Sequence, residues 1–213
     1  MNHNKLNTEF ALIGFGILGY GILAILVSFI SPVAADYSLA RTTSYASFNE
    51  KGALVRPTGY REWVFVGAPL TPNDMNDGKA AFPEFHNVYI DPMSWSHWKK
   101  TDDFTDGTLI VKELVDVGSK QAVSGNGYFQ GKYIGLEAMV KSKKRFPGAP
   151  GNWGFFRFTM ENSRNLHKSA IEQANENCSA CHQSNAAIDM VFTQYYPVLR
   201  AARAQGEAGT GGK

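Results

Sequence analysis

A series of short β-type segments, separated by turn residues, constrains the fold of this chain more than any other feature. These segments are rich in Val, Ile, Tyr, Phe and Trp, which favour strands. They are Tyr60 to Val66, Phe85 to Asp91, Thr108 to Val117, Tyr128 to Lys141 and Trp153 to Thr159. Turn formers lie between them, as in Pro72-Asn73-Asp74 and Ser124-Gly125-Asn126-Gly127. The pattern predicts a mainly β (α+β) fold, with an antiparallel sheet of about five strands.

Helices are expected at three places. A short one, Pro92 to Lys100, falls between the second and third β-type segments. After Asn162 the composition changes, since Leu166 to Gln183 and Ile188 to Ala204 have few β-branched residues and contain Ala, Glu, Gln, Leu and Arg. The sequence therefore predicts two C-terminal helices packed on the sheet.

The first 35 residues differ from the rest of the chain. Phe10 to Ile30 is an uncharged, mostly apolar run of 21 residues that follows Lys5 and precedes Val33-Ala34-Ala35. Small residues at this spacing suit a signal peptidase, and cleavage is expected after Ala35. The run is also long enough for a membrane anchor, and that alternative stays open. Both alternatives imply export, and we expect a periplasmic protein.

Length and charge limit the remaining possibilities. A chain of 213 residues has room for one domain of ordinary size. We expect a leader over residues 1–35, an N-terminal arm over 36–59, a domain over 60–205 and a flexible glycine-rich tail over 206–213. A formal net charge of +2 gives no indication of nucleic-acid binding, and we expect none.

The clearest chemical motif is Cys178-Ser179-Ala180-Cys181-His182. Two thiols at this spacing can each bond one vinyl group of the same porphyrin, and the adjacent imidazole can ligate the iron. A disulfide between Cys178 and Cys181 is the simpler alternative, but it needs no histidine after it. A zinc site would need further ligands, and the chain has no other cysteine. The motif predicts one covalently bound haem c on the C-terminal helices, with His182 as the iron ligand.

The second axial position of the iron is not determined by the sequence. An electron carrier fills it with Met or His, whereas an enzyme or a gas-binding protein leaves it open. The candidates are Met139, Met160, Met190, His86, His97 and His167, and none has a context that marks it as a ligand.

Much of the chain, from about Ser47 to Arg203, resembles the cytochrome P-460 family. The matching segments include Tyr60 to Gly67, Val88 to Pro92, Val111 to Val115, Tyr133 to Glu137, the Cys178 motif and Tyr196 to Arg200. The resemblance implies a mainly β, exported, homodimeric haem c protein. It also implies an enzyme that oxidises hydroxylamine and passes electrons to a soluble c-type cytochrome. The related cytochromes c′-beta bind nitric oxide, so a nitric oxide-binding protein without turnover is the alternative.

In this family a strand lysine is bonded to the porphyrin, and the matching residue here is Lys112. Alternation places Lys112 on the same strand face as Ile110 and Leu114. An apolar face disfavours the ammonium form and therefore favours the nucleophilic amine. The alternative is a lysine whose stem packs while its charge reaches water.

Hydroxylamine oxidation also needs a proton acceptor on the open side of the haem. Glu137 is the first candidate, because it lies in a matching segment and is expected to share a face with Tyr133, Gly135 and Met139. His86 is the second candidate, on a strand with apolar alternate residues. A solvent-facing glutamate and an ordinary core histidine are the respective alternatives.

Overall fold

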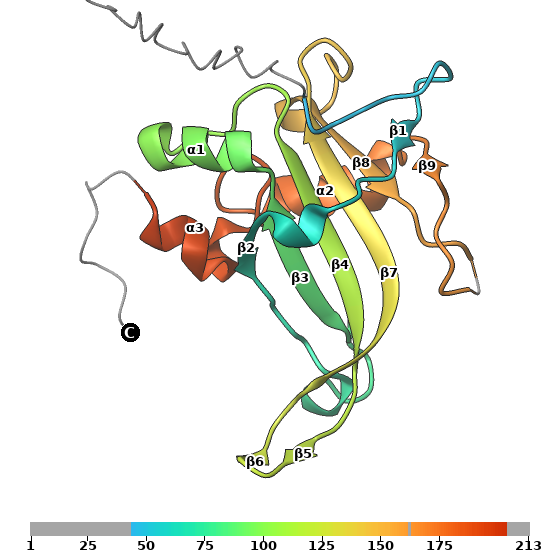
Figure 1. Ribbon diagram of the computed structural model, residues 1–213, viewed down its shortest axis with the longest axis vertical. Coiled ribbons are helices and arrows are strands. Elements are labelled where there is room, and N and C mark those ends of the chain that lie inside the picture. The colour runs from blue at the N-terminus through green and yellow to red at the C-terminus, as the bar shows by residue number, and fades with distance from the viewer. Residues whose placement is uncertain (1–43, 162, 204–213) are drawn as a thin grey trace, which may run out of the picture. The chain divides into compact units, whose positions relative to one another are not determined.

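A five-stranded antiparallel sheet forms the centre of the protein, with the strand order β2-β3-β4-β7-β8 (Figure 1). The computed structural model describes residues 44–161 and 163–203, which belong to one compact unit. The strands are β2 (Val64–Gly67), β3 (Phe85–Ile90), β4 (Leu109–Val117), β7 (Gln130–Lys141) and β8 (Trp153–Arg157). The predicted fold class and the sheet of about five strands are confirmed. The leader and the tail lie outside the described residues.

Smaller elements surround the sheet. Two short pairs of strands are β1 (Leu54–Val55) with β9 (Ser169–Ala170), and β5 (Gln121–Ala122) with β6 (Gly125–Asn126). The α-helices are α1 (Pro92–Thr101), α2 (Asn175–Asn185) and α3 (Pro197–Ala201). Single 3₁₀ turns are η1 (Tyr60–Glu62), η2 (Asn73–Met75), η3 (Pro150–Asn152) and η4 (Thr193–Tyr195). No helix within residues 44–161 and 163–203 is long and apolar enough to cross a membrane.

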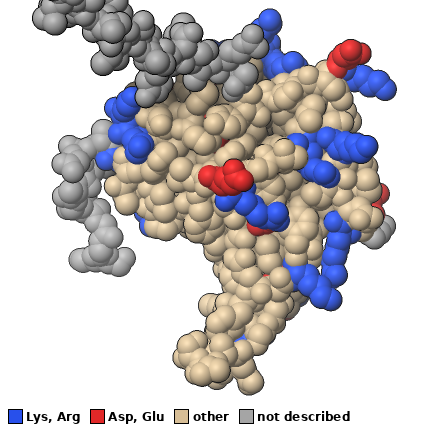
Figure 2. Space-filling view, in the orientation of Figure 1, with Lys and Arg blue, Asp and Glu red and all other residues tan. Residues whose placement is uncertain are grey.

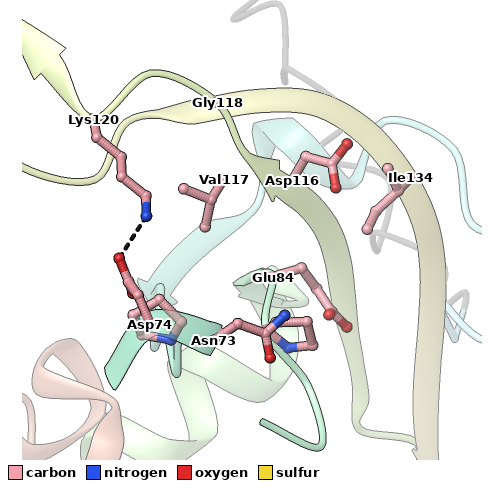
Figure 3. A pocket seen from close by; sticks show the side chains of 10 residues that line it. Asn73, Asp74, Glu84, Asp116, Val117, Gly118, Lys120 and Ile134 are labelled. Atoms are coloured by element: carbon pink, nitrogen blue, oxygen red, sulfur yellow. Dashed lines mark hydrogen bonds and ion pairs between the residues drawn. The ribbon is translucent and has the colours of Figure 1, made fainter. Parts of the chain in front are cut away.

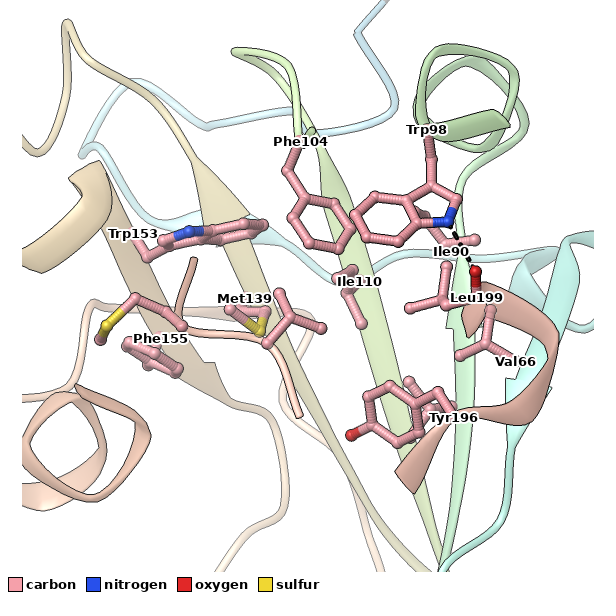
Figure 4. Packing of buried hydrophobic residues seen from close by; sticks show 13 residues of the cluster. Val66, Ile90, Trp98, Phe104, Ile110, Met139, Trp153, Phe155, Tyr196 and Leu199 are labelled. Carbon is pink, nitrogen blue, oxygen red and sulfur yellow. Dashed lines mark hydrogen bonds between the residues drawn. The ribbon is translucent and has the colours of Figure 1, made fainter. Parts of the chain in front are cut away.

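Each face of the sheet carries its own hydrophobic core. One core joins the sheet to α1, α2, α3 and the segment between the last two, and includes Ile90, Ile110, Met139, Phe155 and Leu199 (Figure 4). The other core joins the opposite face to β1, β9 and η1. We call these the helix face and the arm face. Figure 1 shows α2 and η1 on opposite sides of the sheet.

Helix α1 agrees with its prediction, and its ends show why. Asp91 caps the N-terminus, because its Oδ1 accepts the Ser94 amide at 2.9 Å, and Pro92 occupies the first helical position. The second carboxylate oxygen of Asp91 accepts the Leu109 amide of β4 at 2.9 Å. The Trp98 indole donates to the Leu199 carbonyl at 2.9 Å, which attaches α1 to α3.

The prediction of two long C-terminal helices is wrong in extent. Residues 166–174 are not helical, because β9 pairs with β1 and Glu172 bridges to Phe156 of β8. Backbone pairing with distant residues therefore outweighs local helix propensity. The second predicted helix is reduced to α3, since Pro197 has no amide hydrogen and can only begin a helix. The α2 helix, which carries the cysteine motif, is confirmed.

The expectation that Tyr133 shares a face with Glu137 is also wrong. Val115 pairs with Tyr133 while Leu114 pairs with Gly135, so β7 has one extra residue at Ile134. Such a bulge reverses the side-chain alternation beyond it. Tyr133 consequently packs with the arm-face core.

The β5–β6 hairpin extends beyond the sheet (Figure 1). An ion pair between Lys120 and Asp74, with Nζ–Oδ2 at 2.5 Å, attaches this hairpin to η2. On the side shown in Figure 2, the hairpin presents few charged atoms, whereas Lys and Arg are spread over the body of the protein.

Candidate functional site

Helix α2 places the cysteine motif against the helix-face core. Cys178 is half-buried and packs on that core, whereas Cys181 is exposed. The two thiols are not joined in a disulfide. Residues three apart lie on the same side of a helix, so both thiols can reach one flat group beside α2.

His182 follows on the same helix and is held in a fixed orientation. Its Nδ1 is 2.6 Å from the carbonyl oxygen of Met190, and the rings of Phe155 and Phe192 each lie 4.7 Å from the imidazole. Its Nε2 has no hydrogen-bond partner among the described residues. A carbonyl acceptor at Nδ1 requires the proton there and leaves the Nε2 lone pair available, as in haem-ligating histidines.

The electrostatics of His182 favour the same state. Burial lowers the pKa of its imidazole and the Lys112 charge adds to this, which together outweigh the opposing effects of the hydrogen bond to Met190 and of the Glu137 charge. The neutral form, which is the one that binds metal, is therefore favoured.

Lys112 and Glu137 form an ion pair on the helix face of the sheet. They are directly opposite on β4 and β7, with Nζ–Oε2 at 2.7 Å. Their side chains are 26% and 27% exposed, so this pair is reached by solvent. The Phe82 ring lies beneath the ammonium, with its centroid 5.4 Å from Nζ. Ile110, two positions earlier on the same face of β4, belongs to the helix-face core, whereas Lys112 itself is paired with a carboxylate.

The ion pair and the cysteine helix lie in the same site. The charges of Lys112 and Glu137 both act on the pKa of His182. Burial raises the pKa of the Cys178 thiol, Glu137 adds to the rise, and Lys112 opposes it. The geometry agrees, because Phe155, whose ring lies 4.7 Å from that of His182, pairs with Met139, two positions beyond Glu137 on the same face of β7.

His86 lies on the same face, next to a carboxylate that sequence reasoning missed. Its Nε2 is 3.5 Å from Oε1 of Glu84, an ion-pair contact that is too long for a good hydrogen bond. Burial alone would raise the pKa of Glu84, yet the His86 imidazole and the Lys112 ammonium hold it below its ordinary value. Glu84 precedes its strand, and no local pattern distinguishes it from a surface residue.

A cavity of about 320 Å³ opens beside Glu84, at the base of the β5–β6 hairpin (Figure 3). Asp74, Asp116 and Lys120 also line it. None of the cysteines, His182, Lys112 or Glu137 does. The cavity therefore adjoins the site only through Glu84.

The candidates for a second axial ligand are scattered. Met139 and Met190 are buried in the helix-face core, whereas His97 lies on α1. The main chain of His167 pairs with Phe158 on the edge of the arm-face core. No arrangement of these side chains distinguishes one as a ligand.

A histidine held through Nδ1 lies beside two thiols on the same helix and above an apolar sheet face, and this arrangement is of the kind that can hold a haem. The residues fit that group in spacing, tautomer and surroundings. The family model described as Cytochrome P460 matches residues 57–193, which is more than half of the chain. The chain belongs to this family, whose members are haem proteins. A comparison with curated proteins gives no match.

Proposed function

We propose that this chain is an exported mono-haem c enzyme that oxidises hydroxylamine, with nitrous oxide as the expected product. The observation that carries the proposal is the Lys112–Glu137 ion pair on the sheet face against which Cys178 and Phe155, the ring neighbour of His182, pack. A lysine, a carboxylate and an iron-binding helix thus meet on one apolar face.

Three residues of α2 have distinct roles in this proposal. Cys178 and Cys181 would bond the haem vinyl groups, and His182 would ligate the iron through Nε2. The hydrogen bond from Nδ1 to Met190 keeps the imidazole oriented. When bound, the haem supplies the iron site that accepts electrons from the substrate.

Lys112 is the residue proposed to form a third bond to the porphyrin. Its side chain is on the helix face, where the Phe82 ring lies beside Nζ and Ile110 precedes it on the same strand face. The neighbouring carboxylate of Glu137 can take the proton that the ammonium must lose to become the neutral, nucleophilic amine.

Glu137 is then the proton acceptor during turnover. Hydroxylamine oxidation releases equal numbers of electrons and protons, so a carboxylate beside the substrate must receive protons. With Lys112 bonded to the porphyrin, its charge no longer neutralises Glu137. His86 and Glu84 lie farther along the same face, where they can pass protons towards solvent.

The proposed partners come from the family resemblance. Electrons leave to a soluble c-type cytochrome in the periplasm, and the protein acts as a homodimer. These remain expectations from the resemblance. A nitric oxide-binding protein of the c′-beta type is the alternative, and it needs no proton acceptor.

The test compares optical spectra of the reduced wild-type protein and of Lys112→Arg. We expect a Soret band far to the red in the wild type and an ordinary haem c spectrum in the variant, together with a steep loss of hydroxylamine oxidation. Lys132→Arg is the matched control, because Lys132 is an exposed lysine on β7. Replacing Cys178 and Cys181 together by alanine should release the haem into acid acetone.

Identical ordinary spectra for the wild type and Lys112→Arg would show that no cross-link exists. The nitric oxide-binding alternative would then be the better assignment. Haem extracted from the wild-type chain by acid acetone would contradict the covalent attachment itself.

A further inference from the structure

The turn that supplies the acceptor for His182 has an unusual backbone. Asp189 and Met190 both have positive φ angles, 43° and 66°, although neither is glycine. Residues with a side chain rarely adopt this conformation, and two in succession persist only where the surroundings hold them. The turn is closed by the Val191 amide, which donates to the Ile188 carbonyl at 2.8 Å. Its result is that the Met190 carbonyl reaches Nδ1 of His182.

A mostly buried ion pair holds this turn. The Asp189 Oδ2 is 2.6 Å from Nζ of Lys141, the last residue of β7, and the two side chains are 20% and 12% exposed. The other carboxylate oxygen, Oδ1, accepts the indole N–H of Trp153 at 3.2 Å. Trp153 is the first residue of β8. Both strand ends therefore attach to Asp189.

The loop between these strands also packs on the turn. Lys141 donates to the Gly151 carbonyl at 2.9 Å, which fixes the lysine as well. A Cβ on Gly151 would lie 2.7 Å from Oδ1 of Asp189 and 3.1 Å from Cγ of Met190. The loop thus touches the turn directly, and its fit leaves little freedom for the Met190 carbonyl to move.

We propose that Lys141, Asp189 and Trp153 are positioning residues that fix the Met190 carbonyl against His182 and so set the strength of His182 as an iron ligand. The inference rests on the proposed function, in which His182 ligates the haem iron. An acceptor held close to Nδ1–H gives the imidazole more anionic character. The imidazole then donates more strongly, stabilises the oxidised iron and lowers the reduction potential.

The first test is Asp189→Asn. Asparagine has nearly the same size and tolerates positive φ, so the change removes the charge without opposing the backbone conformation. We expect the carbonyl to move away from His182. The reduction potential should rise, by about 59 mV if the ratio of reduced to oxidised protein changes tenfold. The iron–histidine stretching frequency in resonance Raman spectra of the reduced protein should fall.

Lys141→Met separates positioning from simple charge effects. Removing a positive charge near the iron would by itself lower the potential. If Lys141 acts by holding Asp189, its loss should instead raise the potential, as Asp189→Asn does. The double variant should show no further rise, because the two residues act as one unit. Asp74→Asn, which breaks the ion pair with Lys120 at the β5–β6 hairpin, is the matched control. It should change neither the reduction potential nor the iron–histidine stretching frequency.

A lowered potential in Lys141→Met would overturn the inference, as would unchanged potential and stretching frequency in folded, haem-containing variants. The ion pair would then serve stability alone. Should Asp189→Asn fail to fold, Lys141→Met still gives both readings. A wild-type protein with haem but without an iron–histidine band would instead contradict the assignment of His182, which is a failure of the proposed function.

Discussion

Lys112 and Glu113 are neighbours on β4, yet they lie in very different surroundings on opposite faces of the sheet. Lys112 has one carboxylate partner, Glu137, and about a quarter of each side chain is exposed. The Glu113 side chain is only 6% exposed and interacts with three others, Tyr60, Arg61 and Asn87.

The difference indicates what each face is for. On the arm face Tyr60, Arg61 and Asn87 join Glu113 of β4 to η1 and β3, and burial with Glu113 nearby raises the pKa of the Tyr60 hydroxyl. A buried carboxylate with several hydrogen-bond donors stabilises the fold and is poorly suited to transferring protons. On the helix face, the Lys112–Glu137 pair is reached by solvent, so Glu137 is open to proton exchange. Stability and chemistry are therefore divided between the two sides of one strand.

The largest effect is expected for Glu113→Ala. The change leaves the Tyr60 hydroxyl and part of the Arg61 guanidinium without an acceptor, which should lower the free energy of unfolding by about 3 kcal/mol. Urea denaturation measures it. Asp116→Ala is the control, since Asp116 is an exposed carboxylate on the same strand, 3.6 Å from Arg164. An equal decrease in the free energy of unfolding for the two variants would show that the arm-face network stabilises the fold no more than an exposed carboxylate does.

Glu137→Gln should affect activity strongly and stability little. The free energy of unfolding should change by under about 1 kcal/mol, because the pair with Lys112 is partly solvated. Loss of the proton acceptor should reduce hydroxylamine turnover about 100-fold, or about 2.7 kcal/mol in the barrier. Steady-state kinetics on folded protein measures this. Full turnover in Glu137→Gln would remove Glu137 from the proposed mechanism.

Tyr60→Phe probes the arm-face network more gently. The Tyr60 hydroxyl donates to Glu113 at 2.9 Å, and a hydrogen bond to a charged acceptor contributes about 1.5 kcal/mol. Tyr128→Phe removes a similar bond of 3.0 Å to Asp74, but at an exposed position, and should cost much less. Thermal unfolding of both variants checks the comparison, which fails if their losses are the same.

The smallest effect concerns the pH dependence of the stability that Glu84 contributes on the helix face. The pKa of Glu84 is lowered from 4.5 in the folded protein, so ionised Glu84 stabilises the fold above that pH. This contribution should be lost as the pH falls through the lowered pKa. Glu84→Gln should therefore be less stable than the wild type at pH 6 and equally stable in strong acid, as measured by urea denaturation across pH. A difference that persists in strong acid would assign the loss to packing.

Local pattern predicted most of the sheet. The β-type segments became β2, β3, β4, β7 and β8, and the short helix predicted from Pro92 became α1. Alternation along β4 also placed Lys112 on the face with Ile110. These features depend on residues close together in the chain, and for that reason a single sequence reveals them.

Other features depend on register and on distant contacts. The bulge at Ile134 moved Tyr133 to the arm face, and pairing with β1 turned residues 169–170 into a strand. Glu84 gained significance only through its place beside His86. No period or motif in the chain encodes these outcomes, because each arises from the way two separate segments meet.

The sequence by itself determined the strands, the alternation that aims Lys112 and the helix that carries Cys178 and His182. Only the tertiary structure decided that these elements meet on one face of the sheet. It also brought Lys141 to Asp189, 48 positions along the chain, where the pair holds the turn against His182. The physical reason is that local preferences act within a turn or a strand, whereas an ion pair needs two backbones already packed together.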